Sequence, residues 1–98
     1  MAEVKTPIVT AQVVQSLFDG TASAGAIKYQ RPTGGLPVGF HFKCPCGCGV
    51  VGGVSFGPDK WTWNGNPSKP SVQPSIILHT RDGPHWHGYL TDGEWRPV

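Results

Sequence analysis

Apolar and polar residues alternate along most of the chain after residue 25, and a period of two is typical of half-buried strands. In the clearest run, Val38, Phe40 and Phe42 alternate with small or polar residues. Shorter runs of this kind occupy residues 27–29, 50–56, 61–63, 75–80, 86–91 and 94–95. Two Asp-Gly pairs, at 82–83 and 92–93, are typical of hairpin turns. We therefore predict a mostly β fold, a small antiparallel sheet or meander.

The N-terminal residues follow a different pattern. Between a suitable helix cap at Thr10 and a suitable stop at Gly20, four apolar residues recur at the spacing of one helical face: Val13, Val14, Leu17 and Phe18. Residues 20–25 are small and polar, as in flexible linkers. We expect residues 1–25 to form an N-terminal arm with one short helix, and residues 26–98 to form the β domain.

Composition limits the size and the class of the protein. A chain of 98 residues has room for one domain with a modest core, and its 14 Gly and 10 Pro indicate many turns. The net charge of +2 is too small to indicate a polyanionic partner by itself. The longest apolar stretch, residues 76–78, is far short of the roughly 20 residues that span a bilayer, so we expect no membrane partner.

All three cysteines lie within five positions, at Cys44, Cys46 and Cys48. Pro and Gly between them favour a tight turn on which the thiols converge. The odd number of cysteines and the lack of a signal-like N-terminus indicate a reducing compartment. Thiolate-rich sites select zinc or iron–sulfur clusters, and four cysteines for an all-Cys cluster are not available. We therefore predict a zinc site that stabilises the β domain. One residue separates successive cysteines, whereas the commonest zinc-binding turn has two residues between them.

The remaining ligands are expected among the histidines. His85 and His87 alternate on a predicted strand and would point to the same face, so they are the first candidates. Hairpin register cannot be fixed from sequence, so His79 is an alternative. His41, on the strand that leads to the cysteines, is another.

Five blocks of the sequence, in this order, resemble the signature of a family of small proteins of unknown function encoded mostly in bacteriophages and prophages: Lys28–Gly34, Phe40–Gly49, Trp61–Asn66, Pro74–Ile76 and His85–Gly93. The resemblance covers residues 26–96. Some members carry the label ammonia monooxygenase, which a domain of this size without a membrane span does not support.

The resemblance also implies a ligand set. It assigns zinc binding to Cys44, Cys46, Cys48 and His87. Many relatives have a further Cys shortly before the matched His, where this chain has Pro84 and His85. His85 or His79 would then replace that ligand.

These features favour a non-enzymatic, zinc-stabilised phage protein, either a virion structural component or an interaction module. Its partners would be other phage proteins or further copies of itself, contacted through the N-terminal arm. Its location would be the virion or the cytoplasm of the bacterial host.

An enzymatic alternative is a small zinc-dependent hydrolase, because catalytic zinc needs a nearby acid or base and Asp82, Asp92 and Glu94 are near the His block in sequence. Each of these acids lies in or beside a predicted turn, where acids are common. A Ser-His-Asp or Cys-His nucleophilic site ranks lower, because thiols bound to a metal are not free nucleophiles.

A second alternative is a nucleic-acid-binding accessory protein. Trp61 and Trp63 could stack on bases, and Lys60 and Lys69 lie nearby in sequence. Core packing explains the two tryptophans more simply, and no known nucleic-acid-binding module is spelled out.

Overall fold

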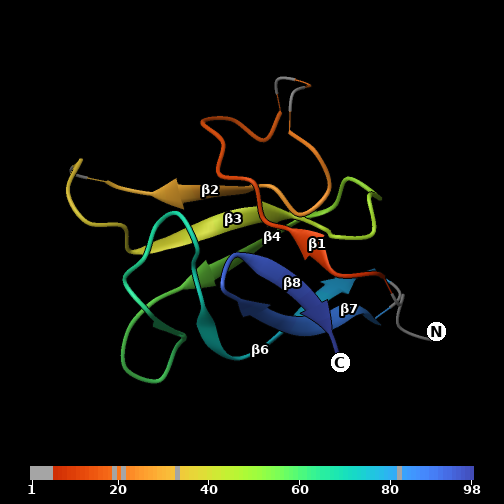
Figure 1. Ribbon diagram of the computed structural model, residues 1–98. Helices are drawn as coiled ribbons and strands as arrows, with labels where there is room; N and C mark the ends of the chain where they lie inside the picture. The colour runs from red at the N-terminus through yellow and green to blue at the C-terminus, as the bar shows by residue number, and fades with distance from the viewer. Residues whose placement is uncertain (1–5, 19, 21, 33, 82) are drawn as a thin grey trace.

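The computed structural model describes residues 6–18, 20, 22–32, 34–81 and 83–98, and within them the chain forms two antiparallel sheets (Figure 1). The larger sheet has the strand order β1 (Val9–Thr10), β8 (Glu94–Pro97), β7 (Gly83–Thr91), β6 (Val72–Thr80) and β5 (Thr62–Trp63). The smaller sheet has the order β2 (Ile27–Gln30), β3 (Gly39–Lys43) and β4 (Val51–Ser55). The predicted mostly β, antiparallel fold is confirmed.

Aromatic side chains fill the space between the two sheets. Figure 1 shows β2, β3 and β4 on one side of the molecule and β6, β7 and β8 on the other. Trp86 and Trp95 from the larger sheet and Phe40 and Phe42 from the smaller one are at most 1% exposed. The rings of Phe42 and Trp95 lie 4.7 Å apart between centroids, and Trp86 meets Trp95 edge-on at 5.6 Å. These contacts fix the smaller sheet against β7 and β8.

The hairpin between β7 and β8 has the turn that its Asp-Gly pair predicts. Thr91 pairs with Glu94, and the two residues between them, Asp92 and Gly93, have φ angles of 50° and 75°. Two positive φ values in a two-residue turn match the right-handed twist of the flanking strands.

The predicted N-terminal helix is wrong, because no residue described between 6 and 25 is helical. The Ala11 N–H donates to Gly93 O at 2.8 Å, and the Val14 N–H donates to Ile27 O at 2.9 Å. Residues 9–14 therefore run between the ends of the two sheets, and the described residues that follow form bends and a turn. Backbone donors and acceptors offered by those sheets outweigh the weak helical preference of a stretch rich in β-branched residues. Residues 1–5, the start of the predicted arm, lie outside the described residues.

The end of the predicted linker is fixed in place. The Gly25 N–H donates to Lys43 O at 3.1 Å, and its carbonyl accepts the Trp95 indole N–H at 2.7 Å. A Cβ at residue 25 would lie 2.8 Å from the Trp95 ring, and its φ is +78°. Only glycine fits such a position without strain. The boundary between residues 25 and 26 itself stays a prediction.

The long β6–β7 hairpin contains two register shifts. The first lies between Val72 and Ile76, and the second between Leu78 and His79. In the second, Leu78 pairs with Trp86 and His79 pairs with Pro84, so His85 is an extra residue on β7. Such bulges bend a strand and change the direction of its side chains. Both shifts lie beside residues of the candidate sites described below.

No helix among the described residues is long and apolar enough to cross a membrane.

Candidate metal centre and active site

The three cysteines lie in the tight connection between β3 and β4. The Cys44 N–H donates to Val50 O at 2.8 Å, so the ladder between the two strands continues one step past Lys43. The Gly47 N–H then donates to Cys44 O at 3.0 Å and closes a turn. Gly47 and Gly49 have φ angles of 87° and 88°, which glycine adopts easily. This backbone brings all three thiols to the inner side of the turn.

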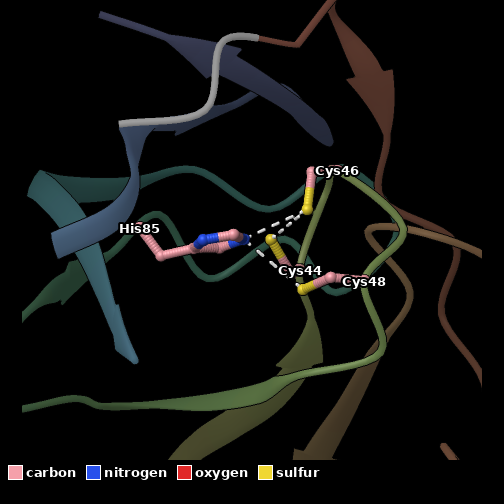
Figure 2. Close-up of side chains that lie close together, drawn as sticks. All are labelled: Cys44, Cys46, Cys48 and His85. Atoms are coloured by element: carbon pink, nitrogen blue, oxygen red, sulfur yellow. Dashed lines mark hydrogen bonds between the residues drawn. The ribbon is translucent and has the colours of Figure 1, made fainter. Parts of the chain in front are cut away.

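The fourth donor comes from β7. His85 Nε2 lies 3.2 Å from Cys46 Sγ and 3.4 Å from Cys48 Sγ, and Cys44 Sγ lies 3.2 Å from Cys46 Sγ. Figure 2 shows the imidazole of His85 pointing toward the three cysteine sulfur atoms. All four donor atoms lie within 4.8 Å of one another.

This donor set fits a metal ion such as zinc. Ligands about 2.3 Å from a tetrahedral zinc are about 3.7 Å apart, which falls inside the observed range. Three thiolates and one imidazole also form one of the closed sets of structural zinc sites. No carboxylate belongs to the group among the described residues. The structure therefore supports part of the prediction of a metal-stabilised β fold, because it contains a Cys₃His cluster that could hold an ion.

Burial differs across the cluster. Cys44 is fully buried, and this burial raises the pKa of its thiol. Burial also raises the pKa of Cys48, but hydrogen bonds from the Val50 backbone and the neighbouring thiols outweigh that effect and leave the pKa below its usual value. A bound cation would favour the thiolate at every position.

The structure brings together four of the five predicted ligands. His87 lies outside the group, and its Nε2 contacts Ser75 Oγ. His79 is exposed on β6 and His41 is exposed on β3, where its ring contacts the Gln30 side chain. The bulge at His85 explains the separation, because it breaks the alternation that would place His85 and His87 on the same face.

The contact of His87 forms a second candidate site. Its Nε2 lies 3.0 Å from Ser75 Oγ, within hydrogen-bonding range of a hydroxyl and an imidazole. Ser75 is on β6 beside the first register shift, and His87 pairs with Ile77 on β7. Both side chains are half-buried, so a hydroxyl and a base lie next to each other at an accessible place. Sequence reasoning did not single out Ser75, although the Pro74–Ile76 block contained it.

The candidate acids of the hydrolase alternative lie elsewhere. Glu94 forms an exposed ion pair with Arg96 at 2.6 Å. Asp92 is exposed in the β7–β8 turn, where its N–H donates to Ser71 Oγ. Asp82 lies outside the described residues. The structure therefore gives the metal cluster no described carboxylate for activating water.

The tryptophans proposed for base stacking belong largely to the packing of the domain. Trp63 stacks on Phe56 with ring centroids 5.0 Å apart and an interplanar angle of 8°. The Trp61 indole N–H donates to the Ser75 carbonyl at 3.3 Å. These contacts use one face of Trp63 and the polar edge of Trp61 within the protein itself.

The sequence model of one protein family matches residues 14–98, which is most of the chain. That family is described as the serine protease of a bacterial ubiquitination-like system, BubE. The chain belongs to this family. No curated protein and no solved structure matches the chain.

Membership of the BubE family overturns two predictions. The resemblance to a phage family of unknown function is wrong as an assignment, because the matching family belongs to a bacterial system. The prediction of a non-enzymatic virion component or interaction module is also wrong, because the family is described as a protease. The description agrees better with the hydrolase alternative, but it names a serine enzyme and not a zinc enzyme.

Proposed function

We propose that this protein is a serine protease in which Ser75 is the nucleophile and His87 is the general base. The observation that carries the proposal is the 3.0 Å contact between Ser75 Oγ and His87 Nε2 in a chain of the BubE family. A hydroxyl becomes a useful nucleophile when a base lies within about 2.6–3.2 Å of it. The pair also lies beside a β-bulge, a common feature of strands next to active sites.

The reaction follows from this geometry. The Ser75 O–H donates to His87 Nε2, which requires the tautomer with its hydrogen on Nδ1. His87 takes the proton as Oγ attacks the carbonyl carbon of the substrate, and then gives it to the departing amine as the C–N bond breaks. Water next attacks the ester on Ser75 and passes one proton to His87. Ser75 recovers its hydrogen, and a carboxylic acid leaves.

We also propose that the Cys₃His cluster holds zinc as a structural ion. The set of four protein ligands leaves no position for water, which is the arrangement of structural sites. A bound zinc would tie the β3–β4 turn to β7, the strand that carries His87. Its role would be to hold the two sheets together, while the bond cleavage uses Ser75 and His87.

Covalent labelling tests the assignment of the nucleophile. A fluorophosphonate should react with the intact protein and add one phosphonyl group, which peptide mass spectrometry should locate on Ser75. Ser75→Ala should abolish the reaction, while Ser55→Ala, a change at an exposed serine of β4, should leave it unchanged. An unlabelled protein that has a normal melting temperature would refute the proposal.

The predicted partner contact through the N-terminal residues stays a proposal. Ile8 is 55% exposed and could contribute apolar area to such a contact. Light scattering of the full chain and of Ile8→Asp would test self-association.

A further inference from the structure

An apolar groove lies between the β2–β3 connection and β5. Its volume is about 440 Å³, and its walls include Leu36, Pro37, Phe56, Pro58, Trp61 and Trp63. Ligand sites in proteins commonly have volumes of about 300–1,000 Å³ and are lined mainly by apolar and aromatic side chains. None of the lining residues carries a charge.

The groove adjoins the candidate nucleophile. Trp61 forms part of its wall, and the indole N–H of the same residue donates to the Ser75 carbonyl at 3.3 Å. Thr62, another lining residue, pairs with Gln73, two positions before Ser75. A polypeptide whose carbonyl carbon reached Ser75 Oγ would therefore have neighbouring residues within reach of the groove.

The walls of the groove are held in place by other contacts. Phe56 and Trp63 stack on each other, and the Phe56 N–H donates to Val38 O at 2.9 Å. The Trp61 N–H donates to Ser55 O at 3.1 Å. In contrast, Leu36 is 83% exposed, so most of its side chain lies in solvent at the edge of the groove. A preformed aromatic surface of this kind loses little entropy when it binds.

We propose that the groove binds a bulky apolar side chain of the polypeptide substrate, close to the bond that is cleaved. This inference rests on the proposed protease function. An apolar side chain would remove the aromatic walls from water, whereas a glycine would leave them exposed. A charged side chain would lose its hydration without gaining a partner, because the lining residues supply no opposite charge.

Quenched fluorogenic peptides test the proposal. In a background of Gly, Ala and Ser, a single Phe or Leu is moved along the peptide, and the cleaved bond is located by mass spectrometry. We expect cleavage at a fixed spacing from the apolar residue, with kcat/KM at least about tenfold higher than for the peptide that lacks it. Peptides with Asp or Lys at that position should be cleaved no faster than the background peptide.

Leu36→Asp is the matching change in the protein, because an exposed side chain can be replaced without disturbing the core. It should lower kcat/KM for the Phe peptide about tenfold, while a fluorophosphonate with small alkyl groups, which does not fill the groove, should still label Ser75. Phe18→Asp is the control, since Phe18 is equally exposed, at 81%, and does not line the groove.

The outcomes separate the two proposals. If Ser75 is labelled but cleavage shows no preference for an apolar residue, or Leu36→Asp equals Phe18→Asp, the groove is not a substrate subsite. If Ser75 is not labelled, both the protease function and the inference that rests on it fail. Binding of the Phe peptide to Ser75→Ala, weakened by Leu36→Asp, would support the inference without relying on turnover.

Discussion

His85 and His87 are two residues apart on β7, yet their imidazoles contact different kinds of atoms. His85 faces three sulfur atoms at the end of the smaller sheet, whereas His87 contacts the Ser75 hydroxyl on β6. A cluster of thiolates and imidazole is suited to a cation, and a hydroxyl beside an imidazole is suited to proton transfer. The chemistry of each histidine is therefore set by what the fold places opposite it.

The two sites also relate differently to the core. Cys44 is fully buried and belongs to the same apolar cluster as Phe42 and Trp86, so the candidate metal site is an extension of the core. Ser75 and His87 are half-buried on the larger sheet, beside an apolar groove. We infer that damage to the first site should reduce stability and activity together, and that damage to the second should reduce activity alone.

Metal removal should have the largest effect. Structural zinc contributes on the order of 10 kcal/mol of apparent binding free energy at pH 7 in small domains, so a strong chelator should unfold the protein or lower its melting temperature sharply. Circular dichroism during titration with the chelator measures this. Chelator already saturated with zinc is the control, and one equivalent of zinc should restore the signal. An unchanged melting temperature in excess chelator would show that the cluster holds no metal ion on which stability depends.

The next effect concerns His87. His87→Ala should lower kcat by a factor on the order of 10³ or more, because the hydroxyl loses its base, while melting temperature and zinc content stay near those of the parent. His79→Ala, a change at an exposed histidine of β6, is the control. His85→Ala should give the opposite pattern, with zinc lost and melting lowered. If His85→Ala and His87→Ala behaved alike, the division into two sites would be wrong.

The two histidines of β7 also show which features can be predicted from the sequence alone and which cannot. Alternation over residues 38–42 and the Asp92–Gly93 pair predict a strand and a turn that the structure contains, because both signals are local. The clustering of Cys44, Cys46 and Cys48 predicts a metal site for the same reason. Whether His85 or His87 joins them depends on a bulge between two strands, and a shift of one residue changes the result.

Ser75 was missed for a related reason. A single serine near the start of a strand carries no spacing signal, and the predicted strand began at Ser75 itself. The structure extends β6 back to Val72, through Pro74, and Ser75, which lies within the register shift of this extension, contacts His87 on the neighbouring strand. The N-terminal helix failed because apolar spacing in a short segment does not compete with hydrogen bonds offered by two sheets.

Gly88 lies on β7, the strand that carries both His85 and His87, and a substitution there tests whether the packing of this strand limits stability. A Cβ at this position would overlap the Arg96 carbonyl and the Trp86 ring, so β7 would have to move away from β8. Gly88→Ala should lower the free energy of unfolding by about 3 kcal/mol, measured by urea denaturation, and should reduce kcat because His87 is the adjacent residue.

Gly53→Ala is the matched control for Gly88→Ala. A Cβ at Gly53 would meet first the His41 ring, at 3.2 Å, an exposed side chain that can shift by a few tenths of an ångström together with the Gln30 side chain it contacts. We expect a change within about 0.5 kcal/mol there. Equal effects at the two glycines would show that the packing of β7 does not limit stability.

The smallest effect is expected at Trp61, which joins β6, the strand of the proposed nucleophile, to the groove. Trp61→Phe keeps an aromatic wall but removes the N–H that donates to the Ser75 carbonyl. Loss of one such hydrogen bond is worth about 1 kcal/mol, so kcat should fall several-fold, with KM for an apolar peptide nearly unchanged. Trp63→Phe is the control, because Trp63 also lines the groove but stacks on Phe56. A change in KM alone for Trp61→Phe would assign this residue to substrate binding and not to the positioning of Ser75.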